Sequence, residues 1–166
     1  GSQWYVKNGK IDFSTTSLIK YNNTWWYVVN GQVDTKSKTI VKYDGSWYYV
    51  SGGKYTQSYT GLLKYNGEWW YIKSGKVSFT TTMCRYNGVW WYIHNGKVDF
   101  NATTLCKYNG TWWYVEKGKV NFNKTTLCKY GSTWYAVSSG KVAWNYTGTI
   151  RYNGNKFNVV NGIVKF

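Results

Sequence analysis

The chain has 166 residues and a formal net charge of +15, which comes from 21 Lys and Arg against 6 Asp and Glu. No apolar run is long enough to cross a membrane, and a field of this sign favours polyanionic partners such as nucleic acid, anionic cell-wall polymers or acidic glycans. Aromatic residues make up 22% of the chain, including 12 Trp and 18 Tyr, which is far more than a core of this size requires.

Self-similarity at a fixed period is the main feature of the sequence. Seven tyrosines recur at intervals of 21 or 22 residues: Tyr21, Tyr43, Tyr65, Tyr86, Tyr108, Tyr130 and Tyr152. Such a period is typical of stacked supersecondary units that cannot bury a core alone. We therefore expect residues 1–166 to form a single array of about seven repeats, partial or divergent at both ends. Function should lie in positions that recur in each repeat, which favours a multivalent binding surface over an enzyme.

The first residues indicate a piece of a longer protein. Gly1-Ser2 resembles a pair of residues left by cloning, and Gln3-Trp4-Tyr5-Val6 starts in the middle of a repeat. We expect the array to be a fragment of a larger surface protein.

One representative repeat shows the predicted elements in chain order. Residues 105–108 form a strand that ends at Asn109-Gly110, a preferred type I′ hairpin turn. Residues 111–115 return, and a second turn at Lys117-Gly118 leads into residues 119–122. The predicted fold class is therefore all-β, a β-solenoid of tandem three-stranded hairpin repeats of about 22 residues, with almost no helix.

Strand alternation assigns the side chains of this repeat to two faces. One face is mostly apolar and is predicted to be the core: Cys106, Trp113, Val115, Val120 and Phe122. The other face mixes aromatic with cationic and amide side chains and is predicted to be the functional surface: Lys107, Trp112, Tyr114 and Asn121.

Three positions after the first turn of each repeat are usually aromatic, and we call them the first, second and third aromatic slots. The second slot is bulky in every copy, from Trp4 to Phe157, as expected for a core position. The first slot becomes Gln3 and Lys156 at the two ends, and the third falls to Ala136 and Asn158. Slots in which the aromatic residue is lost towards the ends of the array are interpreted as functional positions. The predicted glycan-binding residues are Trp25, Trp47, Trp69, Trp90, Trp112 and Trp134 with Tyr27, Tyr49, Tyr71, Tyr92 and Tyr114.

A basic residue precedes each repeat tyrosine, and we call this series the basic ladder. Its predicted anion-binding members are Lys20, Lys42, Lys64, Arg85, Lys107 and Lys129, and Arg151 continues it. The functional interpretation is attraction to a polyanion such as teichoic acid. The alternative is a solvated face that keeps the array soluble and blunts its strand edges.

The three cysteines share one slot of consecutive repeats, which other repeats fill with Ile, Val or Leu: Cys84, Cys106 and Cys128. We predict that they are reduced and buried, because the slot is otherwise aliphatic. An odd count without CxxC spacing does not favour a disulfide or a metal site.

The sequence gives little support for a catalytic site. Asp12, Asp34 and Asp99 occupy the same slot in different repeats, so they do not make an obvious general acid/base pair. His94 stands alone in a turn, where a solvated role is expected. The sequence therefore predicts neither an enzyme nor a metal or cofactor site.

The ladder of turn glycine, Trp-aromatic-Tyr and turn glycine resembles the cell-wall-binding repeats of Gram-positive surface proteins, of choline-binding and glucan-binding type. Residues 60–75, TGLLKYNGEWWYIKSG, carry the resemblance most visibly, and it covers essentially the whole chain. It implies a β-solenoid with a roughly three-fold turn per repeat. It also implies a non-catalytic module, secreted or at the cell surface, that holds a surface protein or an appended enzyme on a polysaccharide.

One departure from the family pattern bears on the ligand. The Trp of the family's TGW motif is replaced by Leu18, Ile40, Leu62, Met83, Leu105, Leu127 and Thr149. In choline binders that Trp helps to build an aromatic cage, so its replacement in a strongly cationic chain disfavours choline capture by cation–π contact. Stacking of aromatic rings on sugars survives the replacement better.

The leading hypothesis is a carbohydrate or cell-wall-binding module whose partner is a polysaccharide, an anionic teichoic acid or a host glycan. The alternatives are a structural spacer or adhesin stalk, and a purely electrostatic binder of teichoic acid. Nucleic acid is disfavoured, because the chain shows no nucleic-acid fold motif. The sequence leaves open whether the first-slot Trp side chains are exposed or packed between repeats.

Overall fold

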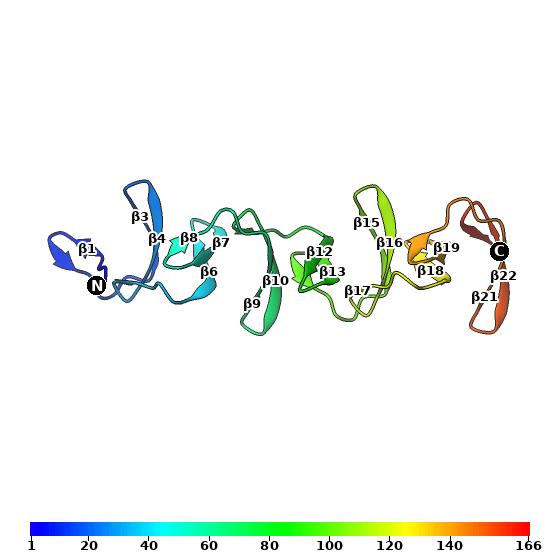
Figure 1. Cartoon of the computed structure of the whole chain (residues 1–166), viewed down its shortest axis with the longest axis horizontal. Helices are drawn as coiled ribbons and strands as arrows, with labels where there is room; N and C mark the ends of the chain where they lie inside the picture. Colours follow the sequence, from blue (N-terminus) through cyan, green and yellow to red (C-terminus); the bar gives the residue numbers. More distant parts are fainter. The chain divides into compact units, whose positions relative to one another are not determined.

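The computed structural model covers residues 1–166 and contains β-strands and turns without helices (Figure 1). The chain divides into two compact units, Gly1–Phe79 (unit 1) and Thr80–Phe166 (unit 2). The predicted all-β fold of tandem hairpin repeats, a β-solenoid, is confirmed by the strands and by the pairing of successive repeats within a unit.

Each complete repeat has two longer strands joined by a tight turn and a short third strand. The strands of unit 1 are β1 (Val6–Lys7), β2 (Lys10–Ile11), β3 (Ser17–Tyr21), β4 (Thr24–Val29), β5 (Gln32–Val33), β6 (Lys38–Tyr43), β7 (Ser46–Ser51), β8 (Lys54–Tyr55), β9 (Gly61–Tyr65), β10 (Glu68–Lys73) and β11 (Lys76–Val77). Those of unit 2 are β12 (Thr82–Tyr86), β13 (Val89–His94), β14 (Lys97–Val98), β15 (Thr104–Tyr108), β16 (Thr111–Glu116), β17 (Lys119–Val120), β18 (Thr126–Tyr130), β19 (Thr133–Ser138), β20 (Lys141–Val142), β21 (Gly148–Tyr152), β22 (Asn155–Val160) and β23 (Ile163–Lys165).

The hairpin register is the one that the sequence predicts. In β15–β16, Cys106 pairs with Trp113 and Lys107 pairs with Trp112. The turn between these strands has φ of 47° at Asn109 and 78° at Gly110, the two positive values that a type I′ turn requires. Because this turn fixes the register, the side chains of each face follow directly from the sequence.

The short third strand joins each repeat to the one before it. Within unit 2, β17 pairs with β13 through Lys119 and Trp91, and β20 pairs with β16 through Lys141 and Trp113. At the same place the Tyr114 N–H donates a 2.8 Å hydrogen bond to the Gly140 carbonyl. Successive repeats are therefore connected by backbone hydrogen bonds as well as by side-chain packing.

Both faces of an interior hairpin contribute to the core, which corrects the predicted division into a core face and a functional face. Cys106, Val115 and Val120 are buried as predicted, against the preceding repeat. On the other face, however, Leu105 and Tyr114 are buried against the following repeat. A hairpin stacked between two neighbours has to bury both of its faces.

Phe122 corrects the prediction in the opposite sense, because its side chain is 46% exposed. Strand β17 ends at Val120, so Phe122 lies in the linker beyond the paired region. Strand alternation therefore no longer determines the side on which it lies.

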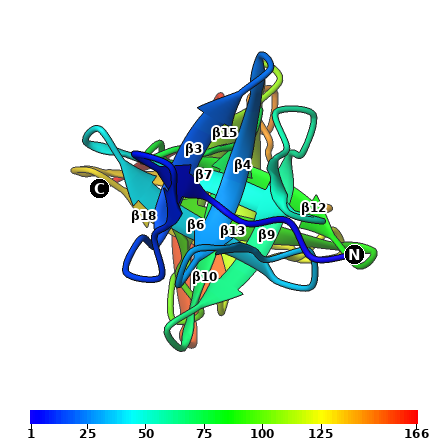
Figure 2. The same ribbon diagram turned by 90° about the vertical axis from the view of Figure 1, so that its left-hand side faces the viewer.

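Successive hairpins point in different directions within a unit (Figures 1 and 2). In unit 1, hairpin β3–β4 points upward and hairpin β9–β10, two repeats later, points downward in both views. In unit 2, β15–β16 and β21–β22 are related in the same way in Figure 1. Within each unit, hairpins two repeats apart therefore point to opposite sides in Figure 1.

The three cysteines are free thiols buried in unit 2, as predicted. Burial raises the pKa of Cys106 and of Cys128 to about 11, from an ordinary value of 9.0. The folded chain therefore holds these protons at a pH where the unfolded chain has released them.

We expect this difference to appear as a loss of stability in alkaline solution. The thiol contribution should be complete below pH 9 and should disappear as the pH rises through about 11. Replacing Cys106 and Cys128 by Val, the residue at position 41 of the same slot, should make the fall in unfolding free energy over this range shallower. Urea unfolding across this pH range would measure the unfolding free energy. Equal slopes for the unaltered chain and the double variant would contradict the raised pKa of the two buried thiols.

The burial of the cysteines also predicts their reactivity. A thiol reagent should modify the cysteines only after the chain has unfolded.

Candidate functional site

The first-slot Trp side chains are half-buried. The ring of such a Trp packs edge-on against the repeat tyrosine of the next repeat. The ring centroids of Trp112 and Tyr130 are 4.9 Å apart, with an angle of 65° between the planes. The same pairing recurs in Trp25–Tyr43, Trp47–Tyr65, Trp90–Tyr108 and Trp134–Tyr152, at 5.0 to 5.7 Å. These tryptophans are thus packed between repeats and exposed in part, whereas the sequence left the two options open.

A residue of the basic ladder lies directly opposite each of these tryptophans. Lys107 pairs with Trp112 across the hairpin, and the other members pair in the same way: Lys20–Trp25, Lys42–Trp47, Lys64–Trp69, Arg85–Trp90 and Lys129–Trp134. Directly opposed residues on antiparallel strands have neighbouring side chains. We call the first-slot Trp, the basic residue opposite it and the tyrosine of the next repeat a junction group.

The basic side chains of the junction groups are exposed and take part in no ion pair. The ammonium nitrogen of Lys20 lies 5.9 Å from the centroid of the Trp25 ring, at the outer limit of a cation–π contact. These charges are not neutralised by the chain itself, so they are available to an anionic or hydroxyl-rich partner.

The predicted exposure of the third-slot tyrosines is wrong. Tyr49, Tyr71, Tyr92 and Tyr114 are only 5–9% exposed, and Tyr27 is half-buried. Burial raises the pKa of Tyr114 to about 12, with a further contribution from the nearby charge of Glu116. The physical reason is the stacking of repeats: this slot faces the next repeat, so its ring becomes part of the core.

The residues that replace the Trp of the TGW motif are also buried, with the exception of Thr149 in the last repeat. Leu105 packs with Tyr114 against Cys128, Val137 and Val142. The position therefore presents an aliphatic side chain to the core and no ring to solvent.

A second set of aromatic and cationic side chains was missed by the sequence reasoning. Trp113 has the exposed Phe122 edge-on at 5.4 Å and the ammonium of Lys141 at 5.0 Å from its ring centroid. Trp91 is similarly placed between Phe100 and Lys119. The lysine comes from the following repeat, so a reading of one repeat by itself could not bring these groups together.

The carboxylates of the shared Asp slot cap turns in the linkers. Oδ1 accepts a 2.9 Å hydrogen bond from a backbone N–H two residues later in three repeats: Asp12–Ser14, Asp34–Lys36 and Asp99–Asn101. The bonds from Ser14, led by its hydroxyl, lower the pKa of Asp12 to about 2. Glu116 accepts 2.8 Å bonds from Lys124 and Asn121, which lower its pKa in the same way. These acids have structural partners within their own turns.

The structure contains no helix that is long and apolar enough to span a membrane. Stacked hairpins with aromatic and basic side chains recurring at the junctions define the class, a β-hairpin repeat array. Seven segments of the chain match the choline-binding repeat: residues 1–12, 14–34, 36–55, 58–78, 79–99, 101–121 and 123–143. The chain belongs to this family, and the resemblance to cell-wall-binding repeats is confirmed.

Solved structures with similar folds include choline binding protein F from Streptococcus pneumoniae, at 23% identity and a TM-score of 0.36 over 91% of this chain and 52% of that one. The modular Cpl-1 endolysin complexed with a peptidoglycan analogue is 18% identical, with a TM-score of 0.37 over 98% and 51% of the two chains. Alternansucrase in complex with isomaltotriose is 16% identical, with a TM-score of 0.40 over 90% and 12%. The chain thus spans about half of the first two structures. No curated protein is significantly similar in sequence.

Proposed function

We propose that this chain is a non-catalytic module that binds a polysaccharide of the cell wall or cell surface and anchors a surface protein or an appended enzyme there. The junction group, repeated along the array, carries the proposal. A half-buried indole held edge-on by a tyrosine keeps a fixed orientation and leaves part of an apolar face for the C–H face of a sugar ring. The opposite Lys or Arg can hydrogen-bond sugar hydroxyl or acidic groups.

The first-slot Trp and the basic residue remain in this proposal, while the third-slot tyrosines do not contact the ligand. Each junction group is small and only partly enclosed, so it should bind one sugar unit weakly. Engagement of several groups by one polymer raises the overall affinity without any new contact. Because hairpins two repeats apart point to opposite sides within a unit, the polymer has to contact different sides of the module.

Pull-down on purified bacterial cell walls, combined with a glycan array, tests the proposal. We expect retention on cell walls and selective binding to polymeric rather than monomeric sugars. Binding to nothing in either assay would favour the structural spacer, which needs the same fold but no ligand affinity.

An electrostatic binder of anionic teichoic acid is the second candidate, because the exposed basic side chains of the junction groups have no acidic partner. Charges in solvent are screened beyond about 8–10 Å at ordinary ionic strength, so salt separates the two candidates. If the chain binds polysaccharide by stacking on Trp, as we propose, its retention should weaken by less than about tenfold when salt is raised to several times physiological ionic strength, because stacking is not screened.

Cell walls stripped of teichoic acid provide the matched control for this measurement. Complete release at moderate salt, together with loss of retention on stripped walls, would show that the basic ladder alone holds the ligand.

A further inference from the structure

Asn-Gly pairs occupy two kinds of turn in the repeats. One set joins the two longer strands at the outer end of a hairpin (Figure 1), and we call its members first-turn pairs: Asn66-Gly67, Asn87-Gly88, Asn109-Gly110 and Asn153-Gly154. The other set joins the second strand to the short third strand, and we call its members second-turn pairs: Asn30-Gly31, Asn95-Gly96 and Asn161-Gly162.

The two sets have the same backbone conformation. In a first turn, φ is 47° at Asn109 and 78° at Gly110, and in a second turn it is 48° at Asn95 and 82° at Gly96. Both turns thus have the two positive φ values of a type I′ turn. Neither the dipeptide nor its φ angles distinguish one set from the other.

Contacts with the linker do distinguish the two sets. In every second-turn pair the glycine N–H donates to a linker carbonyl: Gly31 to Thr15 at 2.8 Å, Gly96 to Thr80 at 3.1 Å and Gly162 to Tyr146 at 2.9 Å. The N–H of the preceding asparagine donates to a threonine hydroxyl of the same linker, at 3.0 to 3.3 Å. The glycines of these pairs are also buried.

The first-turn pairs have none of these contacts, and both residues of each pair are exposed. The N–H groups of their glycines donate no hydrogen bond within the chain. A Cβ at any of these glycines would meet no atom within 4 Å. Solvent therefore reaches the peptide bond between Asn and Gly in this set only.

We propose that the first-turn asparagines are sites of spontaneous deamidation in the folded chain, and that the linker protects the second-turn asparagines. Solvent hydroxide removes the proton of the glycine N–H, and the nitrogen attacks Cγ of the Asn side chain. The N–Cγ bond forms, the bond from Cγ to the side-chain nitrogen breaks, and this nitrogen leaves as ammonia with a proton from water. Water then opens the cyclic imide to aspartate or isoaspartate. Glycine favours the attack because it has no side chain to hinder it.

The linker bond opposes this reaction at its first step. It holds the proton that has to be removed, and it ties the glycine to the linker. A second-turn pair therefore has to detach from the linker before it can react, and such local opening costs free energy. A first-turn pair reacts without this opening.

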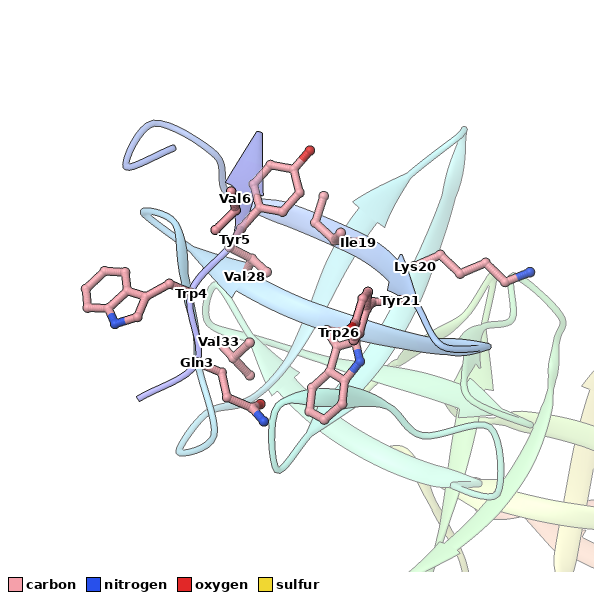
Figure 3. Close-up of a pocket in the computed structure, with 10 residues that line it drawn as sticks. All are labelled: Gln3, Trp4, Tyr5, Val6, Ile19, Lys20, Tyr21, Trp26, Val28 and Val33. Atoms are coloured by element: carbon pink, nitrogen blue, oxygen red, sulfur yellow. The ribbon is translucent and has the colours of Figure 1, made fainter. Parts of the chain in front are cut away.

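The products change the charge and the pairing at the end of a hairpin. Asp44-Gly45 forms the turn between β6 and β7 with φ of 44° and 75°, so aspartate is compatible with this turn. Isoaspartate lengthens the main chain and disturbs the pairing of the flanking residues. Each event also removes one unit of positive net charge beside the basic ladder, whose Lys20 side chain extends away from hairpin β3–β4 in Figure 3.

The test places the same dipeptide in both turns of one repeat. Lys117→Asn puts an asparagine before Gly118, in the repeat that contains Asn109-Gly110. Lys117 has a φ of 51°, a value that Asn adopts more readily than most residues. The Gly118 N–H donates to the Ala102 carbonyl at 2.9 Å, so the new pair has the linker bond. The full chain is incubated in its folded state at constant, mildly alkaline pH, and deamidation of each asparagine is followed by peptide mapping with mass spectrometry.

We expect Asn109 to deamidate at least about tenfold faster than the asparagine introduced at position 117, because the latter has to break its bonds to the linker first. The unaltered chain should show the same order between its first-turn and second-turn pairs. In urea all of these asparagines should react at similar rates. The proposal is overturned if the first-turn asparagines of the folded chain react no faster than the others. It is also overturned if the difference persists in urea, since the flanking sequence would then set the rates. No ligand is involved in this test, so its result is independent of the proposed function.

Discussion

Replacing Trp90, Trp112 and Trp134 together by Gln should abolish retention on cell walls, while Trp112→Gln alone should weaken it by less than about tenfold. The difference follows from multivalency, because linked weak sites can raise the overall affinity about 10²–10⁴-fold and one lost site removes only part of that gain. Gln is a suitable replacement, since Gln3 occupies this slot in the first repeat. Retention of the variants on purified walls, at matched protein concentration, measures the effect.

Three exposed aromatic residues outside the junction groups provide the matched control for this experiment. Phe100, Phe122 and Trp144 are 46–48% exposed, and each belongs to one of the same three repeats. Replacing these three by Gln removes as many rings from the surface and should leave retention unchanged. If this variant loses retention while the triple Trp variant keeps it, the ligand binds on the second set of aromatic side chains. A far-UV spectrum of both variants shows whether the fold is intact.

The basic ladder and the hairpin register could be predicted because both depend on a single repeat. The Asn109-Gly110 turn fixes which residues face each other, so Lys107 falls opposite Trp112 by strand alternation alone. The exposure of Tyr114 could not be obtained in this way. Its side depends on the following repeat, whose Cys128 and Val137 cover it, and the position of that repeat is set by linker geometry and by the pairing of β16 with β20.

Internal comparison of repeats was informative about packing but misleading about function. The third slot lapses to Ala136 and Asn158, and the sequence reasoning interpreted this as the loss of a working position. In the structure, the loss of the tyrosine in the last repeats follows from the stacking of one repeat on the next. Ala136 is still buried, whereas Asn158 is exposed in the last repeat. The first slot lapses to Gln3 and Lys156 as well, so a lapse alone does not separate a binding residue from a packing residue.

Gly118→Ala should destabilise unit 2 far more than Gly110→Ala, although both glycines have a positive φ, 75° and 78° respectively. An L-residue in this region costs about 1–2 kcal/mol, and that cost is common to the two variants. A Cβ at Gly110 would meet no atom within 4 Å, whereas one at Gly118 would collide with the Asp99 carbonyl oxygen and lie 2.8 Å from the Cα of Phe100.

The collision at Gly118 falls on backbone atoms of the linker, which cannot move aside as a flexible side chain would. Gly118 also donates to the Ala102 carbonyl at 2.9 Å and accepts from the Tyr92 N–H at 2.8 Å, so a backbone shift strains both hydrogen bonds. We expect Gly118→Ala to lower the unfolding free energy by at least about 3 kcal/mol more than Gly110→Ala does, because each bond contributes about 1 kcal/mol and the displaced linker loses packing as well. Urea unfolding of the two variants, followed by Trp fluorescence, measures the difference. Similar values for the two would mean that the close approach of turn and linker does not hold neighbouring repeats together.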